Sequence, residues 1–255
     1  MEQEQLLRKI EENTRHKSGF DVILSSNTSV LETSFSPELT LNGPHKIAVD
    51  YVSTYNSIPN VTLKNFTFEY NNGTSTKTVY LRTGSYEIDK LNEEIIFQMK
   101  ANGDYDTAND EPYITIEPNP SRLTVTVNVK GNYVLNLDKD TSIGPMLGFH
   151  QTINLPAGQY ESPNTVNIIK VNGIIITCNL VDSTYLNGKR INALYSFPIE
   201  VSPGFRMVSH PSTPQYHKII QDRVSLLTVT LTDESGDLLD LRGELITIRL
   251  RIEES

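Results

Sequence analysis

Short runs in which apolar and polar residues alternate dominate the sequence. Each run is rich in β-branched and aromatic residues and is bounded by Asn, Gly or Pro, a composition typical of strands. Nine such runs lie at 21–26, 46–55, 62–70, 77–81, 122–129, 167–181, 192–201, 223–232 and 244–252. Many short strands without a regular βαβ alternation predict an all-β, antiparallel fold, and we favour an eight-stranded jelly-roll sandwich.

Two local patterns refine this picture. The Asn-Gly pair in "YNNGT" at 70–74 predicts a hairpin between two of the strands. Apolar residues at helical spacing predict one short inserted helix, with Ser85 placed to cap its start and Gly103 to end it. These residues are Ile88, Leu91, Ile95 and Met99.

Residues 1–18 form a separate segment, an N-terminal arm. Leu6, Leu7 and Ile10 fall on one face of a helical pattern among four acidic and four basic residues. Isolated helices shorter than about 12–15 residues are marginal in water, so this amphipathic arm is expected to dock on its own domain or on a partner. Residues 19–255 contain no fixed-period repeat and no low-complexity block, and they predict a single domain.

Composition narrows the function. The formal net charge of −9 argues against nucleic-acid binding by bulk electrostatics, which needs a surface rich in Lys and Arg. No apolar run approaches the roughly 20 residues of a membrane span, and the first residues lack the apolar stretch of a signal peptide. Cys178 is the single cysteine, so no internal disulfide forms. We therefore expect a protein made in the cytosol, in which the sequons at Asn27, Asn60, Asn65 and Asn72 are by-products of an Asn- and Thr-rich sequence.

Five carboxylates near the C-terminus are the strongest candidate for a metal or catalytic site. They are Asp233, Glu234, Asp237, Asp240 and Glu244. Positions 233–244 begin with Asp and end with Glu, as an EF-hand calcium loop does, but Leu238 stands where that loop needs Gly and strands flank it in place of helices. The residues Ser235-Gly236 favour a turn. We interpret the cluster as the solvated tip of a hairpin between 223–232 and 244–252.

Other candidate chemistry is weak. The histidines at 16, 45, 150, 210 and 217 are scattered, whereas zinc sites usually have paired ligands at close spacing. Cys178 lies in an apolar run, where a buried, inert thiol is expected. The segment "LNGKR" at 186–190 lacks the first glycine and the final hydroxyl of a phosphate-binding loop. The sequence thus predicts no catalytic residue, no metal site and no cofactor, and a protein that is not an enzyme.

Several stretches together resemble the penton, or minor capsid, proteins of Polinton/Maverick elements, adintoviruses and virophages. The likeness covers most of residues 20–252 as a pattern of order and spacing. It lies in "GSYEIDKLNEEI" (84–95), "TSIGPMLGF" (141–149), "VNIIKVNGIIITCNLVDSTYLNGKRINALYSFPIEVSPGF" (166–205) and "LTDESGDLLDLRGELITIRLRI" (231–252).

This resemblance implies a single jelly-roll subunit with a structural role. Five copies would close a pentameric ring at each vertex of an icosahedral double-stranded DNA virus or virus-like transposon capsid, beside a double jelly-roll major capsid protein. The ring contacts are expected in the loops at 101–121, 138–164 and 202–218, and the arm, through Leu6, Leu7 and Ile10, would reach a neighbouring capsomer. No active-site residue carries over, and the chain is expected to have no room for an inserted domain.

Two other functions stay open at this point. A ligand- or carbohydrate-binding jelly-roll module is compatible with the fold class, the twelve Tyr residues and the sequons, although the chain has no Trp. A hydrolase or metal-dependent enzyme on a β-sandwich rests only on the carboxylates and the scattered histidines.

Overall fold

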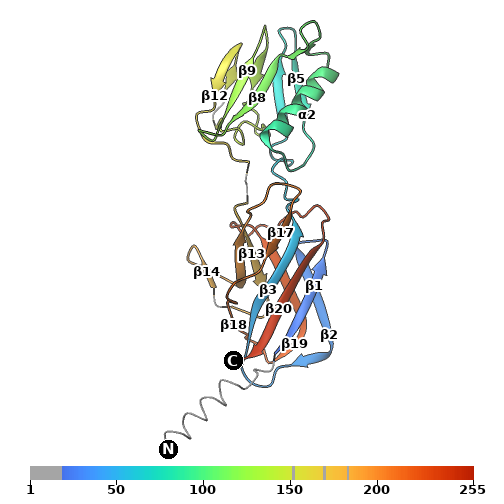
Figure 1. The fold of residues 1–255 in the computed structure, drawn as a ribbon, viewed down its shortest axis with the longest axis vertical. Coiled ribbons are helices and arrows are strands. Elements are labelled where there is room, and N and C mark those ends of the chain that lie inside the picture. The colour runs from blue at the N-terminus through green and yellow to red at the C-terminus, as the bar shows by residue number, and fades with distance from the viewer. Residues whose placement is uncertain (1–18, 151–152, 169–170, 183) are drawn as a thin grey trace, which may run out of the picture. The chain divides into compact units, whose positions relative to one another are not determined.

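The structure, a computed structural model, describes residues 19–150, 153–168, 171–182 and 184–255. The chain divides into two compact units, which we call unit 1 (residues 1–56 and 171–255) and unit 2 (residues 57–170) (Figure 1). The sequence predicted one domain over 19–255 without an insertion, whereas the structure gathers residues 57–170 around a core of their own. Alternating apolar and polar residues show that a strand has one buried face. They do not show which strands pack together into the same core.

Unit 1 is an antiparallel sandwich of two sheets, with four strands on the main path of each. One sheet has the order β1 (Gly19–Ser26), β20 (Ile246–Glu254), β3 (His45–Tyr55) and β17 (Arg206–Ser209), and the two-residue β18 (His217–Lys218) also pairs with β3. The other has the order β16 (Ala193–Pro198), β13 (Gly173–Cys178), β19 (Arg223–Thr232) and β2 (Val30–Thr40). Strands β14 (Thr184–Leu186) and β15 (Lys189–Ile191) form a separate hairpin. The arrangement is the predicted jelly roll.

The apolar positions of these strands face one another inside unit 1. Along β20, Ile246, Ile248, Leu250 and Ile252 are all buried, while the residues between them face outward. The facing sheet contributes Leu227, Val229 and Leu231 of β19 among others. Each fully buried side chain of this size contributes about 1.5–3 kcal/mol, so this two-sided burial holds the sandwich together.

Strands β19 and β20 belong to different sheets, so the predicted hairpin between them does not form. The turn itself is present, because the amide of Asp233 donates to the carbonyl of Asp237 at 2.9 Å. After a short return, in which the Leu239 amide donates to the Leu231 carbonyl, the chain crosses to the other sheet. The sequence could not distinguish these arrangements, because β19 and β20 would show the same alternation if they paired in one sheet as they do when they lie in two facing sheets.

The sequence analysis missed strand β2 and several short strands. Strand β2 contains Pro37, which cannot donate a backbone hydrogen bond, and it is tolerated because β2 is an edge strand. The stretches predicted as long loops hold two- to six-residue strands, for example β12 (Gly158–Glu161) and β17. Their pairing partners, β9 (Thr124–Val129) and β3, lie elsewhere in the chain, so local sequence gives little sign of these two strands.

Unit 2 contains two further antiparallel sheets and the helix. One sheet has the order β11 (Asn154–Leu155), β10 (Val134–Asn136), β4 (Thr67–Asn71) and β5 (Thr76–Tyr80). The other has the order β12 (Gly158–Glu161), β9 (Thr124–Val129) and β8 (Ile114–Asn119), and β6 (Tyr105–Asp106) pairs with β7 (Glu111–Pro112). The predicted hairpin at the Asn-Gly pair is confirmed, since β4 and β5 pair on either side of it.

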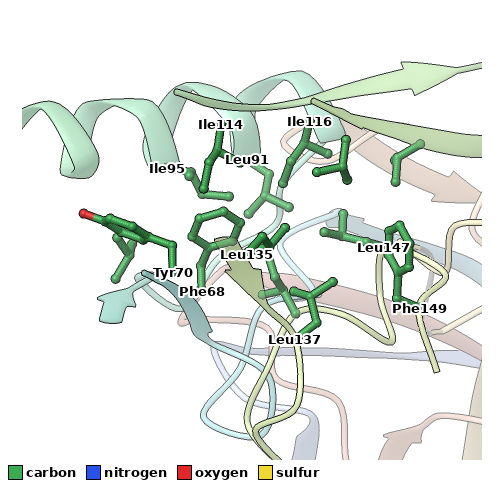
Figure 2. Packing of buried hydrophobic residues seen from close by; sticks show 14 of the residues in the cluster. Phe68, Tyr70, Leu91, Ile95, Ile114, Ile116, Leu135, Leu137, Leu147 and Phe149 are labelled. Carbon is green, nitrogen blue, oxygen red and sulfur yellow. The ribbon is translucent and has the colours of Figure 1, made fainter. Parts of the chain in front are cut away.

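Helix α2 (Ile88–Ala101) packs its predicted apolar face into the core of unit 2. Figure 2 shows Leu91 and Ile95 of the helix among Ile114 and Ile116 of β8, with Phe68 of β4 facing them; all five are at most 1% exposed. Among the described residues, no helix is both long and apolar enough to span a membrane.

The helix does not begin as the sequence predicted. Its N-cap is Glu87, whose side chain makes no capping hydrogen bond, and the hydroxyl of Ser85 instead donates to the carbonyls of Ser57 and Ile58 at 3.2 and 2.6 Å. Ser85 lies two residues before the N-cap, so its hydroxyl ties the entry to the helix to the first residues of unit 2. At the other end, Gly103 follows the C-cap with φ +78°, a left-handed conformation that favours glycine.

Candidate functional site

Two of the five C-terminal carboxylates, Asp233 and Asp240, cap turns at the corner where the chain changes sheets. Asp233 Oδ1 accepts the amides of Ser235 and Asp237 at 2.8 and 3.0 Å, and Asp240 Oδ1 accepts the amide of Arg242 at 2.8 Å. In the described part of the chain, no group of three or more His, Cys, Asp and Glu side chains is placed to hold a metal ion. The first candidate site therefore caps turns in this structure.

The described histidines and Cys178 do not gather into a metal-binding group either. His45 Nδ1 lies 3.0 Å from the carbonyl of Gly43, and burial lowers the pKa of His217. Cys178 is buried, and this burial raises the pKa of its thiol to about 11. A thiol with so high a pKa is protonated at neutral pH and is a poor nucleophile, as expected for a core residue.

A network of ionic side chains covers the outer face of the sheet β1-β20-β3-β17. We call this surface the charged face; its ionic residues are Asp21, Lys46, Asp50, Arg249, Arg251 and Glu253. Arg251 pairs with Asp21 at 3.0 Å and with Glu253 at 3.4 Å, and Lys46 lies 3.7 Å from Glu253. The side chains in these pairs are 18–39% exposed, so the network is only half-buried.

Aromatic residues order the same face. The Lys46 ammonium lies 4.1 Å from the ring centre of Tyr216, and the Arg249 guanidinium lies 5.7 Å from that of Tyr51. Burial, followed by the hydrogen bond to Glu253, raises the pKa of Tyr216 to about 12. Beside these charges, Ile23 of the edge strand β1 is 65% exposed. The charged face thus combines paired charges and aromatic rings with one exposed apolar side chain.

A second polar site lies inside unit 2, around the buried carboxylate of Asp104. We call it the Asp104 cluster; it consists of Tyr70, Asn72, Lys77, Asp104 and Tyr133. Asp104 Oδ2 accepts Lys77 Nζ at 2.6 Å and Tyr70 Oη at 2.7 Å, and Oδ1 accepts Asn72 Nδ2 at 2.9 Å and Tyr133 Oη at 3.0 Å. Nothing in the sequence pointed to this site, because Asp104 falls in the stretch 101–121, which was predicted to be a loop.

The four hydrogen bonds set the charge of the cluster. Burial by itself raises the pKa of Asp104, but the hydrogen bonds from Lys77, Asn72, Tyr70 and Tyr133 outweigh it and lower that pKa to about 2. Burial and the hydrogen bond to Asp104 raise the pKa of both tyrosines. The carboxylate is therefore ionised at neutral pH and holds the end of the β4–β5 hairpin against the segment that follows α2.

The asparagines of three sequons are engaged within the fold. Asn60 and Asn65 are 5% and 8% exposed, and Asn60 Nδ2 donates to the carbonyls of Tyr86 and Ile168 at 2.7 and 3.1 Å. Asn65 Nδ2 donates to the carbonyl of Asn60 at 2.9 Å, and Asn72 belongs to the Asp104 cluster. A glycan on Asn60 or Asn65 would have to displace these buried hydrogen bonds. The arm residues Leu6, Leu7 and Ile10 lie outside the described residues.

Comparison with known proteins gives one structural neighbour to report. The structure is similar to the crystal structure of the selenomethionine-labelled mavirus penton protein, with a TM-score of 0.50 and 12% sequence identity. The match covers 94% of this chain and 100% of the mavirus chain. No protein-family model matches the sequence, and no curated protein matches it. At this identity the similarity establishes the fold, which is that of a penton protein along almost the whole chain.

Proposed function

We propose that this protein is the penton subunit of an icosahedral double-stranded DNA virus or virus-like transposon capsid, of the kind found in Polinton/Maverick elements, adintoviruses and virophages. The observation that carries the proposal is the match to the whole mavirus penton chain, over 94% of this chain. The protein is made in the host cytoplasm and becomes part of the virion, where five copies form a ring at each vertex beside a double jelly-roll major capsid protein.

A five-fold ring requires two different contact surfaces on each subunit, because every copy meets its two neighbours through unlike patches. Unit 1 supports this requirement with two chemically different sheet faces. The charged face is ionic, whereas the outer face of the other sheet carries hydroxyl groups, including those of Thr177, Thr228 and Thr230. The stretches 101–121, 138–164 and 202–218 remain the predicted source of additional ring contacts.

The N-terminal arm supplies a contact between capsomers. Leu6, Leu7 and Ile10 form its apolar stripe, and its acidic and basic side chains balance, which suits contact with protein better than contact with DNA. Removal of residues 1–18 is therefore expected to leave the ring intact and to weaken its attachment to the major capsid protein.

The test is the mass of the purified full-length protein in solution by light scattering, with negative-stain images of the same sample, alone and after co-expression with the major capsid protein. Five-fold rings in either sample support the proposal. A protein that stays monomeric in both samples contradicts it.

A pair of variants locates the ring contact. Ile23 on the charged face and Leu123 in unit 2 are both 65% exposed, so Ile23→Glu and Leu123→Glu add the same charge at equal exposure. We expect Ile23→Glu to reduce the fraction of rings and Leu123→Glu to leave it unchanged. The reverse result would place the contact on unit 2.

A further inference from the structure

One carboxylate in unit 2 bridges a lysine and an asparagine. Asp104 accepts Lys77 Nζ at 2.6 Å through one oxygen and Asn72 Nδ2 at 2.9 Å through the other. We propose that this site joins Lys77 to Asn72 by an intramolecular amide bond, with Asp104 as the catalytic acid and base. The proposal stands on the geometry of unit 2 and does not depend on the capsid function.

Asn72 is held as the electrophile. Its Oδ1 accepts two backbone amides, those of Thr74 at 3.0 Å and Ser75 at 2.9 Å. Two such donors polarise the carbonyl group and stabilise the negative charge that develops on this oxygen when a nucleophile adds to Cγ. The turn that provides them is fixed by Gly73, whose φ is +86°. The two amides that form this Asx turn therefore also act as the oxyanion hole for Asn72.

Lys77 is placed as the nucleophile by strand pairing. Lys77 lies opposite Tyr70 in the β4–β5 hairpin. Asn72 lies two residues after Tyr70 and directly follows the last residue of β4. Tyr70 and Asn72 therefore point to the same face, and Asn72 and Lys77 are diagonal neighbours within reach of a long side chain. The Lys77 ammonium is held there by Asp104 and by the carbonyl of Asn102 at 2.9 Å.

The surroundings shield the Asp104 carboxylate from water, whereas the Lys77 side chain is 31% exposed. Asp104 is 4% exposed, and Tyr70 and Tyr133 donate their hydroxyl groups to it. The rings of Tyr70, Tyr133 and Tyr113 stack in a row, with centroids 6.1 and 4.3 Å apart. Electrostatic stabilisation is stronger in such a site than in water, and Asp104 holds Lys77 and Asn72 side by side on its two oxygens.

The reaction balances without any further reactant. Asp104 takes a proton from the Lys77 ammonium, and the free amine adds to Cγ of Asn72 to form the new carbon–nitrogen bond. Asp104 then returns that proton to Nδ2, and the Cγ–Nδ2 bond breaks to release ammonia. Asp104 passes the second amine proton to this ammonia, which leaves as ammonium. An ammonium and a carboxamide thus become a secondary amide and a free ammonium ion.

The pair is ionised at the start, so the first proton transfer is unfavourable and we expect a slow reaction that happens once in each chain. Its product is a covalent ring over residues 72–77 that closes the end of the β4–β5 hairpin. The bond persists under denaturing conditions, unlike the hydrogen bonds that it replaces.

The test is the intact mass of the purified full-length protein, followed over days at neutral pH. We expect the mass to fall by that of one ammonia molecule, trypsin to lose its cleavage after Lys77, and tandem spectra to show Asn72 and Lys77 in one branched peptide. A mass that stays at the value for the sequence, with normal cleavage after Lys77, overturns the proposal.

Variants separate this bond from the other reaction that releases ammonia here, succinimide formation between Asn72 and Gly73. Lys77→Arg keeps the positive charge beside Asp104 but removes the amine, and Asn72→Ala removes the electrophile. Both should retain the full mass. Loss of ammonia that persists in Lys77→Arg identifies a succinimide and overturns the proposal. Circular dichroism of each variant checks that the fold is retained.

Discussion

The carboxylate of Asp50 lies 2.5 Å from Nε of Arg249 because β3 carries one extra residue at this point. Arg249 pairs with Tyr51 and Leu250 pairs with Val49, so Asp50 is the residue left over. Such a bulge changes the direction in which side chains point. Here the Asp50 carboxylate reaches Arg249, and the ring of Tyr51 lies near the Arg249 guanidinium. The carbonyl of Asp50 is also a partner of His210 Nδ1, which ties the segment after β17 to the same bulge.

The Asp50–Arg249 pair is expected to contribute little to stability by itself. The two side chains are 29% and 39% exposed, and pairs of this kind are worth about 0.2–1 kcal/mol. A double-mutant cycle with Asp50→Ala and Arg249→Ala, measured by urea unfolding, should give a coupling energy in this range that shrinks as salt is added. A coupling several times larger would show that the bulge and the pair form one rigid unit.

The Asp104 cluster should make unit 2 sensitive to acid. The pKa of Asp104 is lowered in the folded chain from 3.8 to about 2, so its contribution to stability is complete above pH 4 and is lost as the pH falls from about 4 to 2. The size of this contribution is about 2 kcal/mol. It is measured as the difference in unfolding free energy between Lys77→Arg, in which no amide bond can form, and the same chain with Asp104→Ala, as a function of pH. A difference that does not change with pH would contradict it.

Burial in the core of unit 2 predicts unequal costs for two phenylalanines. Phe68 is fully buried, and Phe97 on α2 is 68% exposed. Phe68→Ala removes a buried ring and leaves a cavity, so it should lower the free energy of unfolding by about 3–5 kcal/mol. Phe97→Ala should change it by no more than about 0.5 kcal/mol. Equal effects in thermal or urea unfolding would mean that Phe97 is covered in solution.

Residues 57–170 are expected to fold without the rest of the chain. The helix and both sheets of unit 2 share one apolar core, to which residues from Val61 to Leu155 contribute. The isolated segment should show dispersed amide signals in an NMR spectrum and a cooperative thermal transition. If it is unfolded in isolation, residues 19–255 behave as the single cooperative domain that the sequence predicted.

The sequence by itself determined the elements whose pattern is local. Each of the nine alternating runs contains a strand, although the runs at 62–70 and 167–181 begin several residues before β4 and β13. The apolar spacing of Ile88, Leu91, Ile95 and Met99 matches the buried face of α2, and the Asn-Gly pair lies in the predicted hairpin turn. Each signal depends only on residues within a few positions of one another, because burial of one side of an element sets its period.

Only the tertiary structure decided how these elements combine. Nothing in the alternation of 223–232 and 246–254 shows that the two strands lie in different sheets, or that 57–170 forms its own core. The Asp104 cluster likewise joins Asp104 to residues 27 to 34 positions away, whose roles follow from their shared burial and not from a motif. Strand pairing and buried polar contacts depend on residues that are far apart in the sequence. The two-residue period of a strand does not identify its partner, because it is the same whichever strand lies beside it.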